Sequence, residues 1–257
     1  MIDHTSGEAP VRRGWKRLAV RARGWRAGRV VDAVVPVSAA IARRDTERVF
    51  LPARKVRVVY NGIRVDLFPN PERTPREVVR VVYAGQLIPQ KGVMTLLRAH
   101  ERLRAGGVTN YELLVAGAGH QEAALKTFCA TAGLGDVRFL GHTDSVPGLF
   151  GAADVVVVPS EWFEAFGLVA AEAMACGAAC LVSDAGALPE VVGAAGRVFK
   201  AGDAADLADR LRELIRDPEG RRRLGAAGRE RVESLFTLDR MVEGHVAVCE
   251  DVLRGSL

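Results

Sequence analysis

The most constraining stretch of this 257-residue chain is a short apolar run that leads through a loop into strong helix formers. The run is Val155 to Val158, and Pro159 ends it, which is typical of a strand buried on both faces of a parallel sheet. The residues from Leu168 to Cys176 include four alanines, a Leu, a Met and one carboxylate, and they predict a helix. This order places the loop at the carboxyl end of the sheet, where open α/β folds bind ligands.

The start of this helix is suited to holding an anion such as a phosphate. Its first amides have no partner within the helix and carry partial positive charge. These amides belong to Phe166, Gly167, Leu168 and Val169. Gly167 has no side chain and allows close approach. If Glu164 and Glu172 were both helical, they would lie about 80° apart in azimuth and ~12 Å apart along the axis. They are therefore too far apart to share a proton, but they suit hydroxyl groups at two ends of one extended ligand.

The segment FEAFGLVAAEAMACG resembles the E-x7-E signature of retaining glycosyltransferases of the GT-B fold, family 4. The resemblance implies that Glu172 holds the ribose of a sugar nucleotide and that Glu164 lies against the donor sugar. It also implies that the backbone amides between them take the diphosphate. The simpler interpretation is that a glutamate on an alanine-rich helix belongs to a solvated face.

A second corner of the same kind follows the predicted strand Val81 to Ala84. Gly85 ends that strand, and Lys91 precedes the predicted helix Val93 to Arg104. A cation here can neutralise the negative charge that develops on a departing diphosphate, although a surface lysine is the simpler interpretation. The element is similar to the G-R-L-x-x-x-K-G element of the family, with Gln86 in place of the usual arginine. Either donor binding is weaker as a result, or Lys91 acts alone.

The turn after the predicted strand Tyr111 to Ala116 contains Gly117 and Gly119. It is a weak dinucleotide signal, because Glu122 occupies the third glycine position of that fingerprint, which disfavours a Rossmann dehydrogenase. The family resemblance implies instead that this turn lines the nucleotide pocket. The expected catalytic residues are Glu164 and Lys91. The expected donor-binding residues are Gly85, Gln86, Lys91, Gly117, Gly119, Glu164, Phe166, Gly167, Leu168, Val169 and Glu172.

Strands and helices alternate between residues 80 and 200, which predicts an α/β fold with a doubly wound parallel sheet. The resemblance identifies this part as a Rossmann-like, GT-B carboxy-terminal domain. It implies a remnant of the acceptor-binding domain and linker over residues 1–70, a nucleotide-sugar-binding domain over 71–235 and a crossing helix over 236–257. Two full Rossmann-like halves do not fit in 257 residues.

The flanking segments give further local predictions. Ser38 is expected to cap a helix over residues 39–49, after a strand over 33–37. A strand over residues 56–60 is expected to end in a tight turn at Asn61-Gly62. Glu190 is interpreted as a cap or structural partner. Three amphipathic helices are expected over residues 203–216, 218–235 and 238–253, the last capped by Thr237.

Charge is unevenly distributed along the chain. Residues 1–80 contain 18 Lys and Arg against 8 Asp and Glu, a net charge of +10, whereas residues 81–257 have a net charge of −5. Nucleic acid is disfavoured because few aromatic residues accompany these cations. An anionic membrane or carrier lipid suits the run from Arg12 to Arg29 better. In this run Trp15, Leu18, Ala22 and Trp25 have helical spacing, so packing against protein and contact with a membrane both remain open.

Composition excludes several classes of protein. No apolar run approaches the ~20 residues of a membrane span, and no secretory signal is evident, so a cytoplasmic location is expected, with peripheral membrane contact as an extension. The four cysteines lack metal-ligand spacing, and no Asp-x-Asp cluster accompanies the phosphate site, so neither a metal nor another cofactor is expected.

Together with the family resemblance, these features predict retaining transfer of a sugar from a nucleoside-diphosphate sugar to a saccharide or lipid-linked acceptor. The alternative is a non-catalytic module that binds the nucleotide sugar and relies on a partner chain for its acceptor contacts, or a truncated relic.

Overall fold

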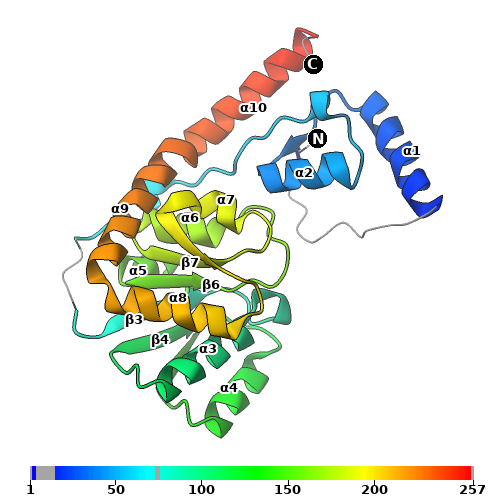
Figure 1. Cartoon of the computed structure of the whole chain (residues 1–257). Helices are drawn as coiled ribbons and strands as arrows, with labels where there is room; N and C mark the ends of the chain where they lie inside the picture. Colours follow the sequence, from blue (N-terminus) through cyan, green and yellow to red (C-terminus); the bar gives the residue numbers. More distant parts are fainter. Residues whose placement is uncertain (1, 4–14, 73–75, 256–257) are drawn as a thin grey trace.

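The computed structural model describes residues 2–3, 15–72 and 76–255, and within these a parallel sheet of six strands dominates the structure (Figure 1). The strands are β3 (Val79–Ala84), β4 (Tyr111–Ala116), β5 (Val137–Gly141), β6 (Val155–Val158), β7 (Ala179–Ser183) and β8 (Gly196–Phe199). Their order is β5-β4-β3-β6-β7-β8, and every neighbouring pair is parallel. The chain builds outward from β3 on one side and from β6 on the other, so a topological switch point lies between them. The predicted doubly wound α/β fold is confirmed.

Helices cover both faces of the sheet, and alternate strand residues supply two separate cores. In β6, Val155 and Val157 belong to one core, while Val156 and Val158 belong to the other. The first core includes residues of α3 (Val93–Ala105), α4 (Glu122–Thr131) and α8 (Ala204–Arg216). The second includes residues of α5 (Val146–Gly151), α6 (Leu168–Ala175) and α7 (Leu188–Val192), and α9 (Pro218–Leu235) packs against α6. All four valines of β6 are buried, which explains why the run has no polar alternation.

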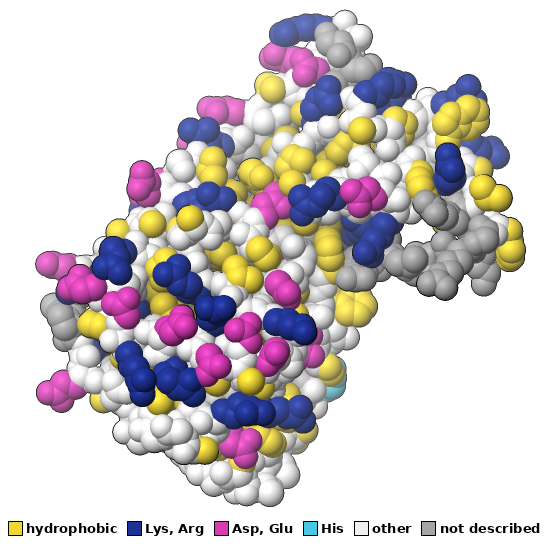
Figure 2. Space-filling model, in the orientation of Figure 1, with side chains coloured by type: hydrophobic (Ala, Val, Ile, Leu, Met, Phe, Trp, Pro, Cys, Tyr) yellow, Lys and Arg dark blue, Asp and Glu magenta, His cyan; other side chains and the backbone are white. Residues whose placement is uncertain are grey.

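The outer surface of the sheet domain carries charges of both signs. Over α8 and α9, Lys and Arg side chains alternate with Asp and Glu side chains (Figure 2). Arg210 pairs with Asp206 on α8, and Arg222 pairs with Glu219 on α9, each about one helical turn apart. Such exposed pairs stabilise a helix only slightly, so this surface serves mainly for solvation.

The segment before the sheet forms a small separate layer. It contains β1 (Ile2–Asp3), α1 (Trp15–Val30), β2 (Val35–Pro36), α2 (Ala39–Glu47) and the short 3-10 turns η1 (Ala53–Lys55) and η2 (Val65–Leu67). Ser38 caps α2 as predicted, with its side-chain oxygen accepting a hydrogen bond from the Ile41 amide.

The strand predicted over residues 56–60 is wrong as a regular strand. This stretch does run beside β2: the Arg57 amide donates to the Val34 carbonyl, and the Val59 amide donates to the Pro36 carbonyl. Only Val56 forms a bridge, with Val34. Pro36 has no amide hydrogen to donate in return, so the ladder stops there.

The tight turn predicted at Asn61-Gly62 is also absent, because neither residue belongs to a turn and the next residue, Ile63, forms a bridge. Ile63 pairs with Thr237, the residue that caps α10 (Leu238–Leu253) as predicted. Gly62 allows this approach, since a Cβ there would lie 2.4 Å from the Thr237 carbonyl oxygen.

The final helix, α10, extends beyond the sheet domain. It lies along the segment that comes before the sheet in the sequence (Figure 1). Its Val248 joins a small buried cluster with Ala33, Val35 and Val59. The segment before the sheet and the final helix therefore share an apolar cluster, against which Met241 and Val252 also pack. No described helix is both long enough and apolar enough to cross a membrane.

Within the described residues, all four cysteines have free thiols, and no group of three or more His, Cys, Asp and Glu side chains has the arrangement of a metal site. Cys129, Cys176 and Cys180 are buried, whereas Cys249 is exposed on α10. Buried thiols of this kind act as small apolar side chains.

A buried histidine links α3 to the start of β4. His100 is fully buried, with its Nδ1 2.6 Å from the Tyr111 hydroxyl and its Nε2 3.1 Å from Asp136. Arg104 also pairs with Asp136, so that carboxylate is compensated without a charge on the imidazole. Burial lowers the pKa of His100 from its usual 6.5, and burial raises the pKa of Tyr111, so the phenol remains a donor to neutral His100.

We expect this histidine to make the fold sensitive to mild acid. Above pH 6.5 the imidazole is neutral in both the folded and the unfolded chain, so its full contribution is present. Below pH 6.5 the unfolded chain takes up a proton that the folded chain does not, and the free energy of unfolding falls by at most about 1.4 kcal/mol per pH unit. Urea unfolding between pH 7 and pH 5.5 measures this slope. His100→Gln should make it shallower, and an identical slope in the variant would contradict this role.

Candidate functional site

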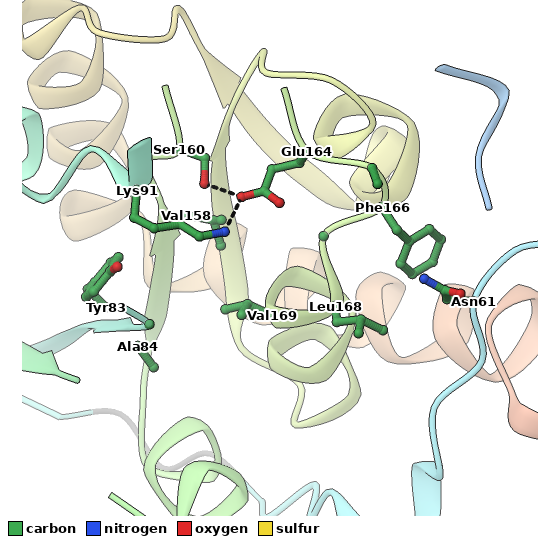
Figure 3. Close-up of a pocket in the computed structure, with 13 residues that line it drawn as sticks. Asn61, Tyr83, Ala84, Lys91, Val158, Ser160, Glu164, Phe166, Leu168 and Val169 are labelled. Atoms are coloured by element: carbon green, nitrogen blue, oxygen red, sulfur yellow. Dashed lines mark hydrogen bonds and ion pairs between the residues drawn. The ribbon is translucent and has the colours of Figure 1, made fainter. Parts of the chain in front are cut away.

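A pocket of about 320 Å³ opens at the carboxyl ends of β3 and β6, at the topological switch point (Figure 3). Its walls come from three parts of the chain that are distant in sequence: the segment before the sheet, the β3–α3 corner and the β6–α6 corner. The lining residues are Asn61, Tyr83, Ala84, Gly85, Lys91, Val158, Ser160, Glu164, Ala165, Phe166, Gly167, Leu168 and Val169.

One wall is the amino-terminal end of α6. Gly167 precedes the helix with φ +104°, a conformation that favours glycine, and a Cβ there would lie 2.5 Å from the Leu188 side chain. Its carbonyl accepts the amides of Ala170 and Ala171, which begins the helical hydrogen bonding. Within the described residues, the amides of the four residues from 166 to 169 have no acceptor. The end of α6 therefore presents unpaired donors to the pocket.

The opposite wall carries Lys91, the only cation among the described residues that line the pocket. Lys91 is the last residue of the 3-10 turn η3 (Pro89–Lys91). Gly92 follows with φ +67° and is the N-cap residue of α3. A Cβ on Gly92 would lie 1.9 Å from the carbonyl oxygen of Pro159, so the two corners touch backbone against backbone. This close contact brings the Lys91 side chain across to the β6–α6 loop.

Lys91 and Glu164 meet inside the pocket (Figure 3). The Lys91 Nζ lies 2.6 Å from Glu164 Oε1, and the Ser160 hydroxyl donates to the same oxygen at 2.6 Å. No described residue donates to Oε2, the second carboxylate oxygen. Glu164 is thus held on one side, while its other oxygen remains available to a ligand.

The Glu164 backbone is fixed by a third corner, between β7 and α7. The Ala187 amide donates to the Glu164 carbonyl at 2.9 Å, and a Cβ on Gly186 would lie 2.2 Å from that carbonyl oxygen. The Ser183 hydroxyl donates to the Ser160 carbonyl at 2.6 Å. This support leaves the position of Glu164 well defined before any ligand arrives.

Tyr83 closes the floor of the pocket from β3. Its hydroxyl donates to the carbonyl of Gln86 at 2.7 Å. Burial, and then the charge of Glu164, raise the pKa of Tyr83, so the phenol stays neutral at physiological pH.

Seven of the predicted donor-binding residues come together in this pocket. They are Gly85, Lys91, Glu164, Phe166, Gly167, Leu168 and Val169. The side chain of Gln86 is exposed and does not line the pocket. Gly117 and Gly119 do not line the pocket but pack against the backbone that follows β3. A Cβ on Gly117 would lie 1.8 Å from the Gly85 carbonyl oxygen, and one on Gly119 would lie 2.3 Å from the Leu87 carbonyl oxygen. They shape the β3 corner rather than line the pocket.

Glu172 lies one turn further into α6 and also does not line the pocket. It is half-buried, burial raises its pKa, and no described residue donates a hydrogen bond to its carboxylate. A carboxylate held in this way costs stability unless a ligand supplies donors. Glu172 is therefore partly removed from solvent, unlike a residue of a fully solvated face.

Sequence reasoning missed three polar side chains of the pocket, Asn61, Tyr83 and Ser160. Ser160 directly follows the apolar run and its proline, which is a usable signal for a residue at the carboxyl end of a strand. Tyr83 reads as one more apolar strand residue, and Asn61 reaches the pocket only because the extended segment before the sheet packs against it. Their roles depend on contacts between distant segments.

The segment before the sheet is joined to the site by a long-range helix cap. Glu190, on α7, accepts the amides of Ala39 and Ala40 at 2.7 and 2.9 Å, so its carboxylate lies on the amino-terminal end of α2. Tyr60 also hydrogen-bonds Glu190, and burial together with this bond raises its pKa to about 12. Ser38 donates to the Ala165 carbonyl of the pocket loop at 2.7 Å. The interpretation of Glu190 as a cap is confirmed, although the helix that it caps lies about 150 residues away in sequence.

Removing this cap should loosen the whole junction. Glu190→Ala takes away two charge-assisted hydrogen bonds to helix amides, and we expect a loss of about 2 kcal/mol in the free energy of unfolding. Denaturant unfolding measures it against Glu230→Ala, which removes an exposed carboxylate of α9. Equal stability of the two variants would show that the cap contributes nothing.

Comparison with known proteins adds three findings. The model of the family described as Glycosyl transferases group 1 matches residues 66–231. N-acetyl-alpha-D-glucosaminyl L-malate synthase of Bacillus anthracis is 29% identical over 87% of this chain and 60% of its own length. MMP alpha-(1->4)-mannosyltransferase of Mycolicibacterium hassiacum is 31% identical over 96% of this chain and 62% of its own. The chain thus spans about three fifths of the length of these curated relatives.

Solved structures show the same fold. A glycosyltransferase from Rickettsia africae superimposes with a TM-score of 0.82 at 18% identity, covering 96% of this chain and 69% of that one. Anabaena HepE, in complex with UDP and glucose, superimposes with a TM-score of 0.76 at 22% identity, covering 92% of this chain and 67% of that one.

Proposed function

Because the chain belongs to the group 1 glycosyl transferases, we propose that its pocket binds a nucleoside-diphosphate sugar and that the protein transfers the sugar with retention of configuration. The proposed acceptor is a saccharide or a lipid-linked saccharide. The assignment to family 4 of the GT-B enzymes is part of the proposal. So is the division into residues 1–70, 71–235 and 236–257, in which the first and last parts belong to the acceptor side.

One observation carries the proposal: a single cavity contains both unpaired helix amides and a lysine ammonium. The diphosphate is proposed to lie on the amides from Gly167 to Val169, where the partial positive charge of α6 attracts it. Lys91 then lies beside the oxygen that gains charge as the bond between the sugar and the diphosphate breaks. The present Lys91–Glu164 ion pair keeps the ammonium in this position before the donor binds.

The two glutamates take the two ends of the donor in this proposal. Glu164 lies against the sugar, with Oε2 accepting its hydroxyl groups, while Ser160 keeps the carboxylate oriented through Oε1. Glu172 accepts the ribose hydroxyl groups, which would provide the missing donors for its half-buried carboxylate. Lys91 and the helix amides neutralise the diphosphate, and the expectation that no metal is needed stays a prediction.

Gln86 departs from the family pattern and adds nothing to the charge of the pocket. Its side chain is exposed, and its carbonyl is held by Tyr83. Under this proposal Lys91 acts as the single side-chain cation on the diphosphate.

A thermal-shift screen of UDP-, GDP- and ADP-sugars tests the proposal. A ligand that binds only the folded chain stabilises it by about 2.7 kcal/mol at 100 times its dissociation constant, which corresponds to a shift of roughly 5–10 °C for a chain of this size. We expect one class of nucleotide to give such a shift, and the free sugar to give none. No shift with any of the three would contradict the proposal.

A further inference from the structure

Helix α1 is packed in an unusual way, since it buries its glycines and exposes its tryptophans. Gly24 and Gly28 face the protein, where a Cβ on Gly24 would lie 2.1 Å from the Val49 carbonyl oxygen and one on Gly28 would lie 2.5 Å from Pro52. The glycines that weaken this helix in isolation are therefore its contact face, because they let it approach the chain closely. The bulky side chains point away from this contact face.

The outward side of α1 carries a stripe of apolar side chains. Trp15, Leu18 and Trp25 are 73%, 66% and 55% exposed. With ~100° per residue, these three and Ala22 span about 80° of the helix circumference, and the stripe is centred about 120° from the two buried glycines. Large apolar side chains exposed together on one helix mark a contact surface rather than a solvated face.

Cations flank this stripe, and the sequence of α1 contains six Lys and Arg and no carboxylate. Arg26 and Arg29 are exposed, and the Arg29 guanidinium lies 3.7 Å from the centre of the Trp25 ring. In Figure 2 dark blue and yellow side chains lie next to one another over α1. The surface is therefore both apolar and positively charged.

We propose that α1 docks the protein on an anionic lipid bilayer, with its tryptophans in the headgroup region and its arginines on lipid phosphates. Tryptophan suits this interface because its ring has an apolar body and a polar edge, and each arginine adds electrostatic attraction. A second copy of the chain is a poor occupant, since a symmetric contact would place the same cations against one another. The inference rests on α1 alone and holds whether or not the pocket binds a nucleotide sugar.

Co-sedimentation with vesicles tests the docking on the full chain. We expect binding to phosphatidylcholine vesicles that contain about 30% phosphatidylglycerol, weak binding to pure phosphatidylcholine, and release as salt rises from about 0.1 M to about 1 M. Arg26→Glu combined with Arg29→Glu should weaken binding by at least about 30-fold, since the loss of each cation alone weakens it roughly fivefold and each new carboxylate is repelled by the anionic lipid. The matched control is Arg98→Glu with Arg216→Glu, which makes the same change of net charge at exposed positions on α3 and α8. Equal weakening by both pairs, or equal binding to neutral vesicles, would overturn the proposal.

Fluorescence provides a second readout that does not depend on charge variants. The chain has three tryptophans, so Trp162→Phe leaves only the two on α1. We expect their emission to shift to the blue with anionic vesicles, and inorganic phosphate to leave it unchanged. An unchanged spectrum in vesicle-bound protein would mean that another surface makes the contact. A blue shift that follows self-association without lipid would assign the stripe to a second copy, and either result refutes bilayer docking by α1.

Discussion

Lys91→Met is expected to lower the rate of sugar transfer, or of donor hydrolysis, by about 100- to 1,000-fold. Within the described part of the chain Lys91 is the only cation that lines the pocket, so its loss leaves the developing charge of the diphosphate to the α6 amides. Removal of one such preorganised group from an active site typically has an effect of this size. The rate with saturating donor measures it, while thermal unfolding checks that the fold survives.

The matched control is Lys126→Met, because Lys126 also pairs with a glutamate, at 2.7 Å, but on the exposed surface of α4. It should retain the activity of the unaltered protein. A Lys91→Met protein that keeps half or more of its activity would remove Lys91 from the proposed chemistry. Lys91→Arg should recover part of the loss, since it keeps the charge but changes its geometry.

Glu172→Ala is expected to abolish measurable donor binding. The ribose would lose hydrogen bonds to a charged acceptor, each worth about 1.5–3 kcal/mol, so two of them amount to a loss of 100-fold or more in affinity. Isothermal titration calorimetry with the nucleotide sugar found in the thermal-shift screen measures this loss.

The stability of the same variant separates binding from structure. Burial raises the pKa of Glu172, and no described residue donates a hydrogen bond to its carboxylate, so alanine should leave the unliganded protein at least as stable as before. Unchanged donor affinity would refute the ribose role. A large loss of stability would instead make Glu172 a structural residue.

The fold was largely predictable because its strands are short and buried on both faces. Val155–Val158 and Ala179–Ser183 match their predicted bounds, since turn signals interrupt each apolar run at its ends. Helix α10 also begins where its Thr237 cap predicts. The stretch 56–60 was wrong as a strand, because its pairing depends on Pro36 in a distant segment and not on its own alternation.

The candidate site was predictable only in part. Local sequence places Lys91, Glu164 and the α6 amides at carboxyl ends of strands, and the structure brings them into one pocket. The contacts that orient Glu164 are not local, since they need Gly186 and the hydroxyl of Ser160 in fixed positions. Such contacts follow from packing and leave no pattern in the sequence.

For helix α1 the sequence predicted the helix but not the face that packs against the protein. Its spacing of Trp15, Leu18 and Trp25 predicts an amphipathic helix, but it does not say which face the protein covers. The close contacts at Gly24 and Gly28 decide that question, and they leave the tryptophans outside.

The most direct test of the central claim is a crystal structure of the chain with a nucleoside-diphosphate sugar bound. We expect phosphate oxygens within hydrogen-bond distance of the Leu168 and Val169 amides, the Lys91 ammonium beside the same phosphates, and ribose hydroxyl groups on Glu172. A donor bound elsewhere, with the Lys91–Glu164 pair unchanged and the α6 amides facing only water, would contradict the central claim.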